Sequence, residues 1–179
     1  SMGRLFDAVS ALLGVCLEAS YEAQAAIELE MAATRLLVDG LLPAGPDYTF
    51  DLDVSGEPAI VRLRALLAAL LYDIQVGTPV PKVALRFHRT IARMTVEVCR
   101  HVSAQSGLRT VALSGGCYQN RLLLALTVHA LRAAGFQVLT HRHVPCNDGS
   151  VSLGQAAIAC WQSTSPERKP GTSLHTSDR

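Results

Sequence analysis

The sequence predicts an α/β fold preceded by a pair of N-terminal helices. Two segments in the second half of the chain each combine a short β-prone run, a glycine-bearing turn and a stretch of apolar residues at helical spacing. Most of the first half shows apolar residues at helical spacing without such turns, which indicates amphipathic helices. The chain therefore begins with helices and ends in the order β, α, β, α.

The N-terminal part predicts a helical hairpin followed by a small strand hairpin. Apolar stripes at 5–17 and 25–37 have helical spacing, and Gly40 can terminate the second helix. Apolar and polar residues then alternate over 48–54, and the Ser55-Gly56 pair turns the chain towards a short edge strand at 58–60. We expect this hairpin to be a small antiparallel insertion.

Two further helices are predicted in the middle of the chain. Leucines keep helical spacing through 63–74, and the Gly and Pro residues at 77–81 break that pattern. A longer amphipathic helix is expected at 81–103, and Gly107 is expected to separate it from the next strand.

The first β, turn, α unit carries a candidate anion site. A strand at 110–113 leads through Gly115 and Gly116 into a predicted helix at 120–134. Glycines let the backbone approach an anion closely, and the free N–H groups at a helix N-terminus favour negative charge. A nucleotide phosphate is one candidate ligand. The same two glycines could simply form the tight turn of an α/β crossover.

The second unit repeats this arrangement with a carboxylate at the turn. A strand at 137–139 is followed by Pro145, and Asn147 or Asp148 can cap a helix expected at 150–161. Asp148 could be a helix cap or could hold a hard cation beside a phosphate, since oxygen ligands suit such ions. The last residues, 163–179, contain Pro, Lys and Gly without an apolar face, and we expect a disordered tail.

Composition limits the classes of function. The 179 residues are 49% hydrophobic and carry a net charge of +1, and charged residues interrupt every apolar stretch before it could span a bilayer. The near-zero charge argues against nucleic acid as a partner. The five cysteines are odd in number and lack CxxC spacing, which predicts that the protein is located in the reducing cytoplasm. We therefore expect neither a nucleic-acid nor a membrane partner.

Several polar residues allow a structural and a functional interpretation. His141 and His143 lie two positions apart near Cys146, which could suggest zinc, although such alternation also arises by chance. The remaining polar residues at issue lie on predicted helices, where we expect the carboxylates to be solvated and the histidines to be surface or half-buried. They are Asp7, Glu18, Glu22, Glu28, Glu30, His88, His101 and His129.

Four motifs, in order along the chain, resemble the C-terminal part of the HypF family, the carbamoyltransferases of [NiFe]-hydrogenase maturation. They are GRLFDAV at 3–9, YEAQAAIELE at 21–30, LSGGCYQNRLL at 113–123 and PCNDGSVSLGQA at 145–156. The resemblance covers about residues 3–160. It implies that 1–162 form the second lobe of an actin-like, sugar-kinase-like ATPase (ASKHA) domain.

The resemblance also implies an activity that needs more than this lobe. In the family, N-terminal domains make carbamoyl adenylate from carbamoyl phosphate and ATP. The final domain transfers the carbamoyl group to the C-terminal cysteine of HypE, and that group becomes the cyanide ligand of the hydrogenase iron. The expected partners are thus the HypE cysteine tail and the N-terminal HypF domains, and the isolated lobe is expected to be inactive.

Carried over by motif, the resemblance assigns residues to the nucleotide and to a metal. Asp7 would face the ribose or adenylate of ATP, and Gly115, Gly116 and Asn120 would hold the nucleotide. Asp148 would coordinate a divalent metal ion, Mg or Fe/Zn, whose family histidine pair is not in this chain. No catalytic residue is assigned.

Two departures from the family pattern bear on this site. Ala23 stands where the family usually has Gly, and Ser150 replaces a second Gly after Asn-Asp-Gly. Both changes bring into question a close backbone approach to substrate. The alternatives are an O-carbamoyltransferase or threonylcarbamoyl-transfer relative, and a non-catalytic docking lobe whose apolar face packs on a partner.

Overall fold

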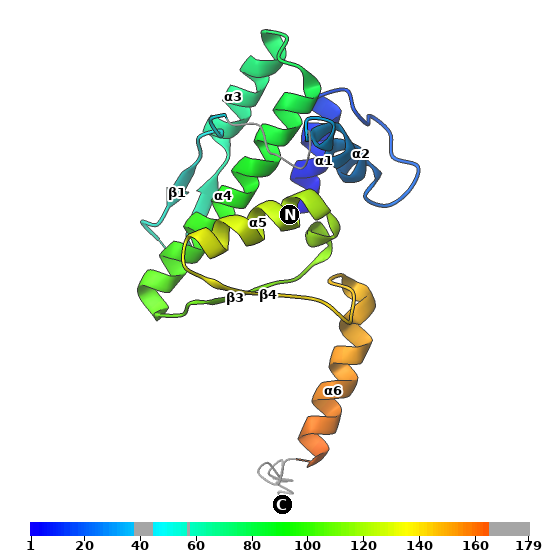
Figure 1. The fold of residues 1–179 in the computed structure, drawn as a ribbon, viewed down its shortest axis with the longest axis vertical. Helices are drawn as coiled ribbons and strands as arrows, with labels where there is room; N and C mark the ends of the chain where they lie inside the picture. Colours follow the sequence, from blue (N-terminus) through cyan, green and yellow to red (C-terminus); the bar gives the residue numbers. More distant parts are fainter. Residues whose placement is uncertain (38–44, 57, 165–179) are drawn as a thin grey trace, which may run out of the picture.

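The computed structural model describes residues 1–37, 45–56 and 58–164. Its longest helix, α4, runs through the centre of the molecule, with α1 and α2 beside one end (Figure 1). The elements are α1 (Met2–Leu12), α2 (Gln24–Thr34), β1 (Asp51–Asp53), β2 (Ile60–Arg62), α3 (Arg64–Gln75), α4 (Val80–Ser106), β3 (Thr110–Leu113), η1 (Gly116–Gln119), α5 (Arg121–Ala133), β4 (Gln137–Thr140), η2 (Asp148–Ser150) and α6 (Val151–Thr164).

The predicted α/β order is confirmed, and the largest differences lie in the N-terminal helices. The first helix ends at Leu12, five residues before the predicted stripe ends, because Gly14 adopts φ +65°. The Gly14 N–H then bonds the Ala11 carbonyl and the Val15 N–H bonds the Ser10 carbonyl, which closes the helix end. The second helix ends at Thr34, and the predicted stop at Gly40 lies outside the described residues.

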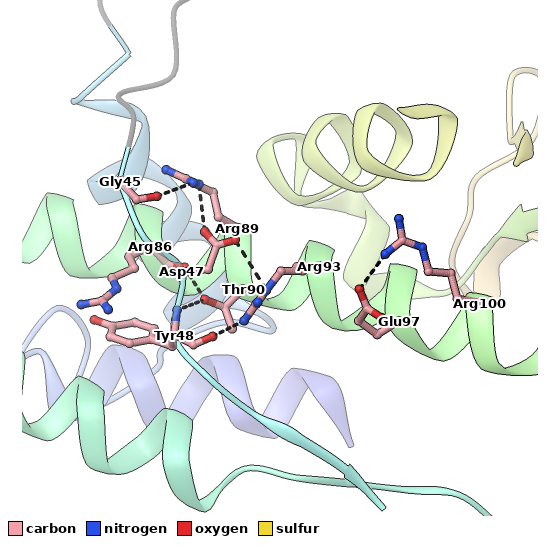
Figure 2. Close-up of polar contacts among 9 residues, drawn as sticks. All are labelled: Gly45, Asp47, Tyr48, Arg86, Arg89, Thr90, Arg93, Glu97 and Arg100. Atoms are coloured by element: carbon pink, nitrogen blue, oxygen red, sulfur yellow. Dashed lines mark hydrogen bonds and ion pairs between the residues drawn. The ribbon is translucent and has the colours of Figure 1, made fainter. Parts of the chain in front are cut away.

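The strand hairpin is antiparallel, with Asp51 opposite Arg62. Its first strand is shorter than the predicted 48–54, and its second strand, Ile60–Arg62, begins two residues after the predicted 58–60. The segment before it is fixed to α4 by side chains that Figure 2 shows. The Tyr48 N–H donates to Thr90 Oγ1 at 2.9 Å, and Asp47 lies between Arg89 (3.1 Å) and Arg93 (3.6 Å). These contacts hold the insertion against the central helix.

The two later strands form a parallel pair, with Thr110 opposite Gln137 and Leu113 opposite Thr140. The helix α5 connects them and packs against both α4 and β4. A small apolar cluster under this unit consists of Val96, Leu113, Leu131 and Phe136. This crossover places the turn after β3 and the turn after β4 at the same edge of the sheet.

The main core surrounds α4 and joins it to the N-terminal helices. Phe6 of α1 packs edge-to-face on Phe87 of α4, with ring centroids 5.0 Å apart, and Leu29 and Leu123 bring α2 and α5 into the same cluster. Aromatic and leucine side chains of this size contribute about 1.5–3 kcal/mol each when fully buried. The core therefore fixes α1, α2 and the start of α5 relative to one another.

The last helix projects away from the rest of the molecule (Figure 1). It has no buried residue, and its large exposed apolar side chains are Val151, Leu153, Ile158 and Trp161. Ser163 and Thr164, expected at the start of the tail, are helical, whereas 165–179 lie outside the described residues. Among the described helices, none is both long and apolar enough to cross a membrane.

Candidate functional site

A cavity of about 920 Å³ lies between α1, the start of α2 and the turn after β3. Asp7, Gly116 and Asn120, which come from three separate parts of the sequence, all line it. Gly115 lies next to this wall in the chain, and Asp148 is outside it. The structure thus brings together three of the five residues that the sequence motifs single out.

The two glycines after β3 have different conformational demands. Gly115 adopts φ +102° and ψ 156°, a region essentially restricted to glycine, whereas Gly116 starts η1 without a positive φ. The Gly115 N–H donates to the Cys146 carbonyl at 2.6 Å, which ties the first turn to the second. A Cβ at Gly116 would meet no atom within 4 Å, so its backbone borders open space.

The N-terminus of α5 is already occupied by protein groups. Asn120 Oδ1 accepts from the Leu123 N–H at 2.7 Å, and Glu30 Oε1 accepts from the Leu122 N–H at 3.0 Å. The expectation that free helix N–H groups receive a phosphate is therefore wrong for these two amides. Within the described residues the Gly116 N–H donates no hydrogen bond to protein, which leaves it for an anion.

Glu30 was expected to be a solvated side chain on a helix face, and that interpretation is wrong. Its carboxylate is half-buried, lines the cavity and caps a helix 92 residues further along the chain. A carboxylate at this position is also favoured by the positive end of the α5 dipole. The sequence offers no local signal for this contact, because the two partners meet only in the folded chain.

His88 is completely buried, contrary to the expectation of a surface or half-buried histidine. Its ring packs edge-to-face on Phe6 at 5.2 Å, Nδ1 donates to the Ala84 carbonyl at 2.8 Å, and Nε2 accepts from Asn120 Nδ2 at 3.0 Å. Burial lowers the pKa of His88 to about 4, so the ring is neutral at pH 7. Its place three residues before the buried Ile91 on the apolar stripe of α4 could have indicated this burial.

Asp7 places a carboxylate in the cavity wall from α1. The side chain is 40% exposed and lies 3.6 Å from the more exposed Arg4 guanidinium. An exposed pair of this kind contributes little to stability, about 0–1 kcal/mol. The Asp7 carboxylate can therefore accept hydrogen bonds from a polar ligand, such as a sugar hydroxyl, at small cost.

The two departures from glycine behave differently in the structure. Ala23 lines the cavity with φ 62°, the left-handed conformation that glycine favours, so its backbone is strained but keeps the course a glycine would take. Ser150 has no positive φ, and its hydroxyl donates to the Asn147 carbonyl at 3.1 Å. The loss of glycine is thus strained only at Ala23.

Asp148 does not have the surroundings of a complete metal site. It is exposed at the start of η2, and the preceding Asn147 accepts from the Gly149 N–H at 3.2 Å. His141, considered as a zinc ligand, instead lies 3.0 Å from the Ser114 hydroxyl. No group of three metal-binding side chains occurs in the parts of the chain that the structure describes, so these residues alone do not fit a metal.

Residues 1–155 match the family described as the carbamoyltransferase Kae1-like domain, second subdomain. This match gives the class of protein to which the fold and the cavity belong. The chain is 36% identical to carbamoyltransferase HypF of Synechocystis over 155 residues, which cover 87% of this chain and 19% of that protein. It superposes with a TM-score of 0.81 and 33% identity on a solved structure of full-length HypF in the phosphate- and nucleotide-bound form.

That structural match covers 94% of this chain and 21% of the HypF chain. The chain therefore belongs to the HypF carbamoyltransferase family and has the fold of the second lobe of its ASKHA-like domain. It spans about one fifth of the length of these two relatives. A tRNA N6-adenosine threonylcarbamoyltransferase of Prochlorococcus marinus is 28% identical over 159 residues, covering 87% of this chain and 44% of that protein.

Proposed function

We propose that this chain is the lobe of a carbamoyltransferase that binds ATP and carbamoyl adenylate for hydrogenase maturation. The observation that carries the proposal is the cavity in which Asp7, Gly116 and Asn120 meet, within a chain of the HypF family. A HypF relative of this fold was solved in a nucleotide-bound form, which supports a nucleotide as the ligand.

Each of these residues can make one kind of contact with an adenylate. The Asp7 carboxylate accepts hydrogen bonds from ribose hydroxyls, and the Gly116 N–H donates to a phosphate oxygen at a point where no side chain intervenes. Asn120 presents an amide held at both ends by protein groups. This arrangement orients a bound adenylate and needs little rearrangement on binding.

In the proposed reaction the acceptor is the C-terminal cysteine thiol of HypE. The thiol loses its proton, its sulfur forms a bond to the carbamoyl carbon, and the bond from that carbon to the phosphate oxygen breaks to release AMP. The N-terminal HypF domains supply the carbamoyl adenylate from carbamoyl phosphate and ATP. We propose that the protein carries out this transfer in the cytoplasm.

Asp148 is proposed as one ligand of a divalent metal ion, Mg or Fe/Zn. A bound cation there would polarise a carbamoyl or phosphoryl oxygen. Because the described residues do not complete such a site, the other ligands have to come from outside them. The roles of Asp7, Gly116 and Asn120 do not depend on that ion.

The test is transfer of the carbamoyl group by a full-length protein that contains this lobe. Carbamoyl phosphate, ATP and a peptide ending in the HypE cysteine are the substrates, and mass spectrometry detects the thiocarbamate. Asp7→Asn in the full-length protein should reduce transfer, and the exposed Arg100→Gln, which lies outside the cavity lining, is the matched control. Transfer to a small hydroxylated acceptor, with the peptide left unmodified, would contradict the proposal.

A threonylcarbamoyl-transfer enzyme is a second candidate, favoured by the match to the Prochlorococcus relative. An O-carbamoyltransferase would share the nucleotide site and differ in its acceptor. The same assay distinguishes these candidates when tRNA or a hydroxylated compound replaces the peptide. Modification of tRNA alone would favour the threonylcarbamoyl reaction.

A docking role is a third candidate, favoured by the last helix. All of α6 is exposed, including Trp161 at 69%, and an isolated helix of 14 residues is marginal in water. Leu139 of β4 is a further exposed apolar side chain, at 50%. Sedimentation tests the idea: self-association that Trp161→Ser abolishes would support it, and a strict monomer without affinity for a separately made first lobe would oppose it.

A further inference from the structure

A continuous chain of hydrogen bonds runs from α4 through two side chains to α5. The Ala84 carbonyl accepts from His88 Nδ1 at 2.8 Å, and His88 Nε2 accepts from Asn120 Nδ2 at 3.0 Å. Asn120 Oδ1 then accepts from the Leu123 N–H at 2.7 Å. A carbonyl at one end and a backbone N–H at the other allow only one arrangement of protons.

That arrangement fixes the state of both side chains. The His88 ring is neutral with its proton on Nδ1, since the Ala84 carbonyl can only accept. Asn120 must then turn its nitrogen towards His88 and its oxygen towards Leu123. One of the two Nδ2 hydrogens is used by His88, and the other remains beside the cavity that Asn120 lines.

We propose that His88 is a positioning residue that holds the Asn120 amide with its second N–H directed at a nucleotide in the cavity. The inference rests on the proposed function and adds a residue that touches no ligand itself. Glu30 performs a parallel task on the same helix end by holding the Leu122 N–H. Together the two side chains determine how the start of α5 meets the cavity.

Filling the core does not by itself require a histidine here. Phe6 and Phe87 surround the ring, and a leucine would satisfy the same apolar surroundings. The leucine would remove the acceptor for Asn120 Nδ2 and leave that buried N–H free to rotate away from its position. Glutamine, by contrast, is flexible and carries an amide oxygen that can accept from the same N–H.

The first measurement needs no ligand. Nitrogen-15 NMR of the chain at pH 7 should show His88 protonated on Nδ1, and the Asn120 side-chain amide protected from exchange. That protection should be lost in His88→Leu and kept in His88→Gln. A ring protonated on Nε2, or protection unchanged in a folded leucine variant, would overturn the positioning role.

The second measurement is the affinity for ATP with magnesium by calorimetry. We expect His88→Leu to bind about tenfold more weakly, the value of one hydrogen bond of about 1.4 kcal/mol, and His88→Gln to stay within about threefold of the parent. Equal affinity of a folded leucine variant would overturn the proposal. If the parent itself binds no ATP, the proposed nucleotide role of this chain fails, and the NMR result alone decides the positioning role.

A third variant covers the case in which the leucine variant does not fold. Asn120→Asp keeps an oxygen for the Leu123 N–H and places a second oxygen against His88 Nε2. The ring should then take up a proton on Nε2, which moves its nitrogen-15 shifts. Shifts identical to those of the parent would show that the two side chains do not interact and would overturn the proposal.

Discussion

Acidification should destabilise this protein through His88, and the size of the effect follows from its burial. Burial lowers the pKa of His88 from 6.5 to about 4 in the folded protein, whereas the unfolded chain keeps the ordinary value. Between these two pH values the unfolded state binds a proton that the folded state does not. The stabilising contribution is therefore complete above pH 6.5, decreases as the pH falls, and is lost below about pH 4.

The magnitude can be worked from the same two pKa values. Each unit of difference corresponds to about 1.4 kcal/mol, so the full loss of unfolding free energy is about 3 kcal/mol. About 2 kcal/mol of this should be lost by pH 5. Such a loss is a large part of the typical stability of a domain, about 5–15 kcal/mol.

The assay is urea unfolding of the parent and of His88→Gln from pH 7 to pH 4. The Asp7 and Glu30 side chains place two carboxylates in the wall of the nearby cavity. Both proteins keep those groups, so the difference in unfolding free energy isolates His88. That difference should shrink by about 3 kcal/mol on acidification. A difference that stays constant with pH would refute the reasoning.

Four further substitutions test the backbone and capping arguments. Gly115→Ala should cost about 1–3 kcal/mol of unfolding free energy because of its φ of +102°, whereas Gly116→Ala should leave stability unchanged and weaken ATP binding; equal stability effects would contradict this. Ala23→Gly should relieve the φ of 62° and stabilise the fold by about 0.5–1 kcal/mol, and a lower Tm would oppose it. Glu30→Ala should cost about 1–2 kcal/mol by leaving the Leu122 N–H without its acceptor, as measured by urea unfolding. The control is Glu97→Ala, which removes a half-exposed carboxylate paired with Arg100 of the same helix, and equal losses in the two variants would argue against the cap.

Local sequence signals predicted most of the secondary structure. The helix around 81–103 was found from its apolar spacing, and Gly107, which adopts φ +72°, ends it as expected. The strand at 110–113 and the helix that follows were also placed within one residue. The residues that begin or end these elements, a glycine or a capping Asn, lie next to them in the sequence.

The contacts that complete the site could not be predicted in the same way. His88 meets Asn120 across 32 residues, and Glu30 meets Leu122 across 92, so neither pairing leaves a local pattern. A glutamate on an amphipathic helix is usually solvated, and only the approach of α5 to α2 gives Glu30 a backbone N–H to accept from. The side-chain partners at the start of α5 could therefore be identified only from the folded structure.

The most direct test of the account is calorimetric titration of ATP with magnesium into this chain and into Asp7→Ala and Asn120→Ala. The account predicts saturable binding that both substitutions weaken, since both side chains line one cavity. The folded state of each variant is checked by its thermal unfolding. Binding that neither substitution alters, or no saturable binding by the parent, would contradict the claim that this cavity is a nucleotide site.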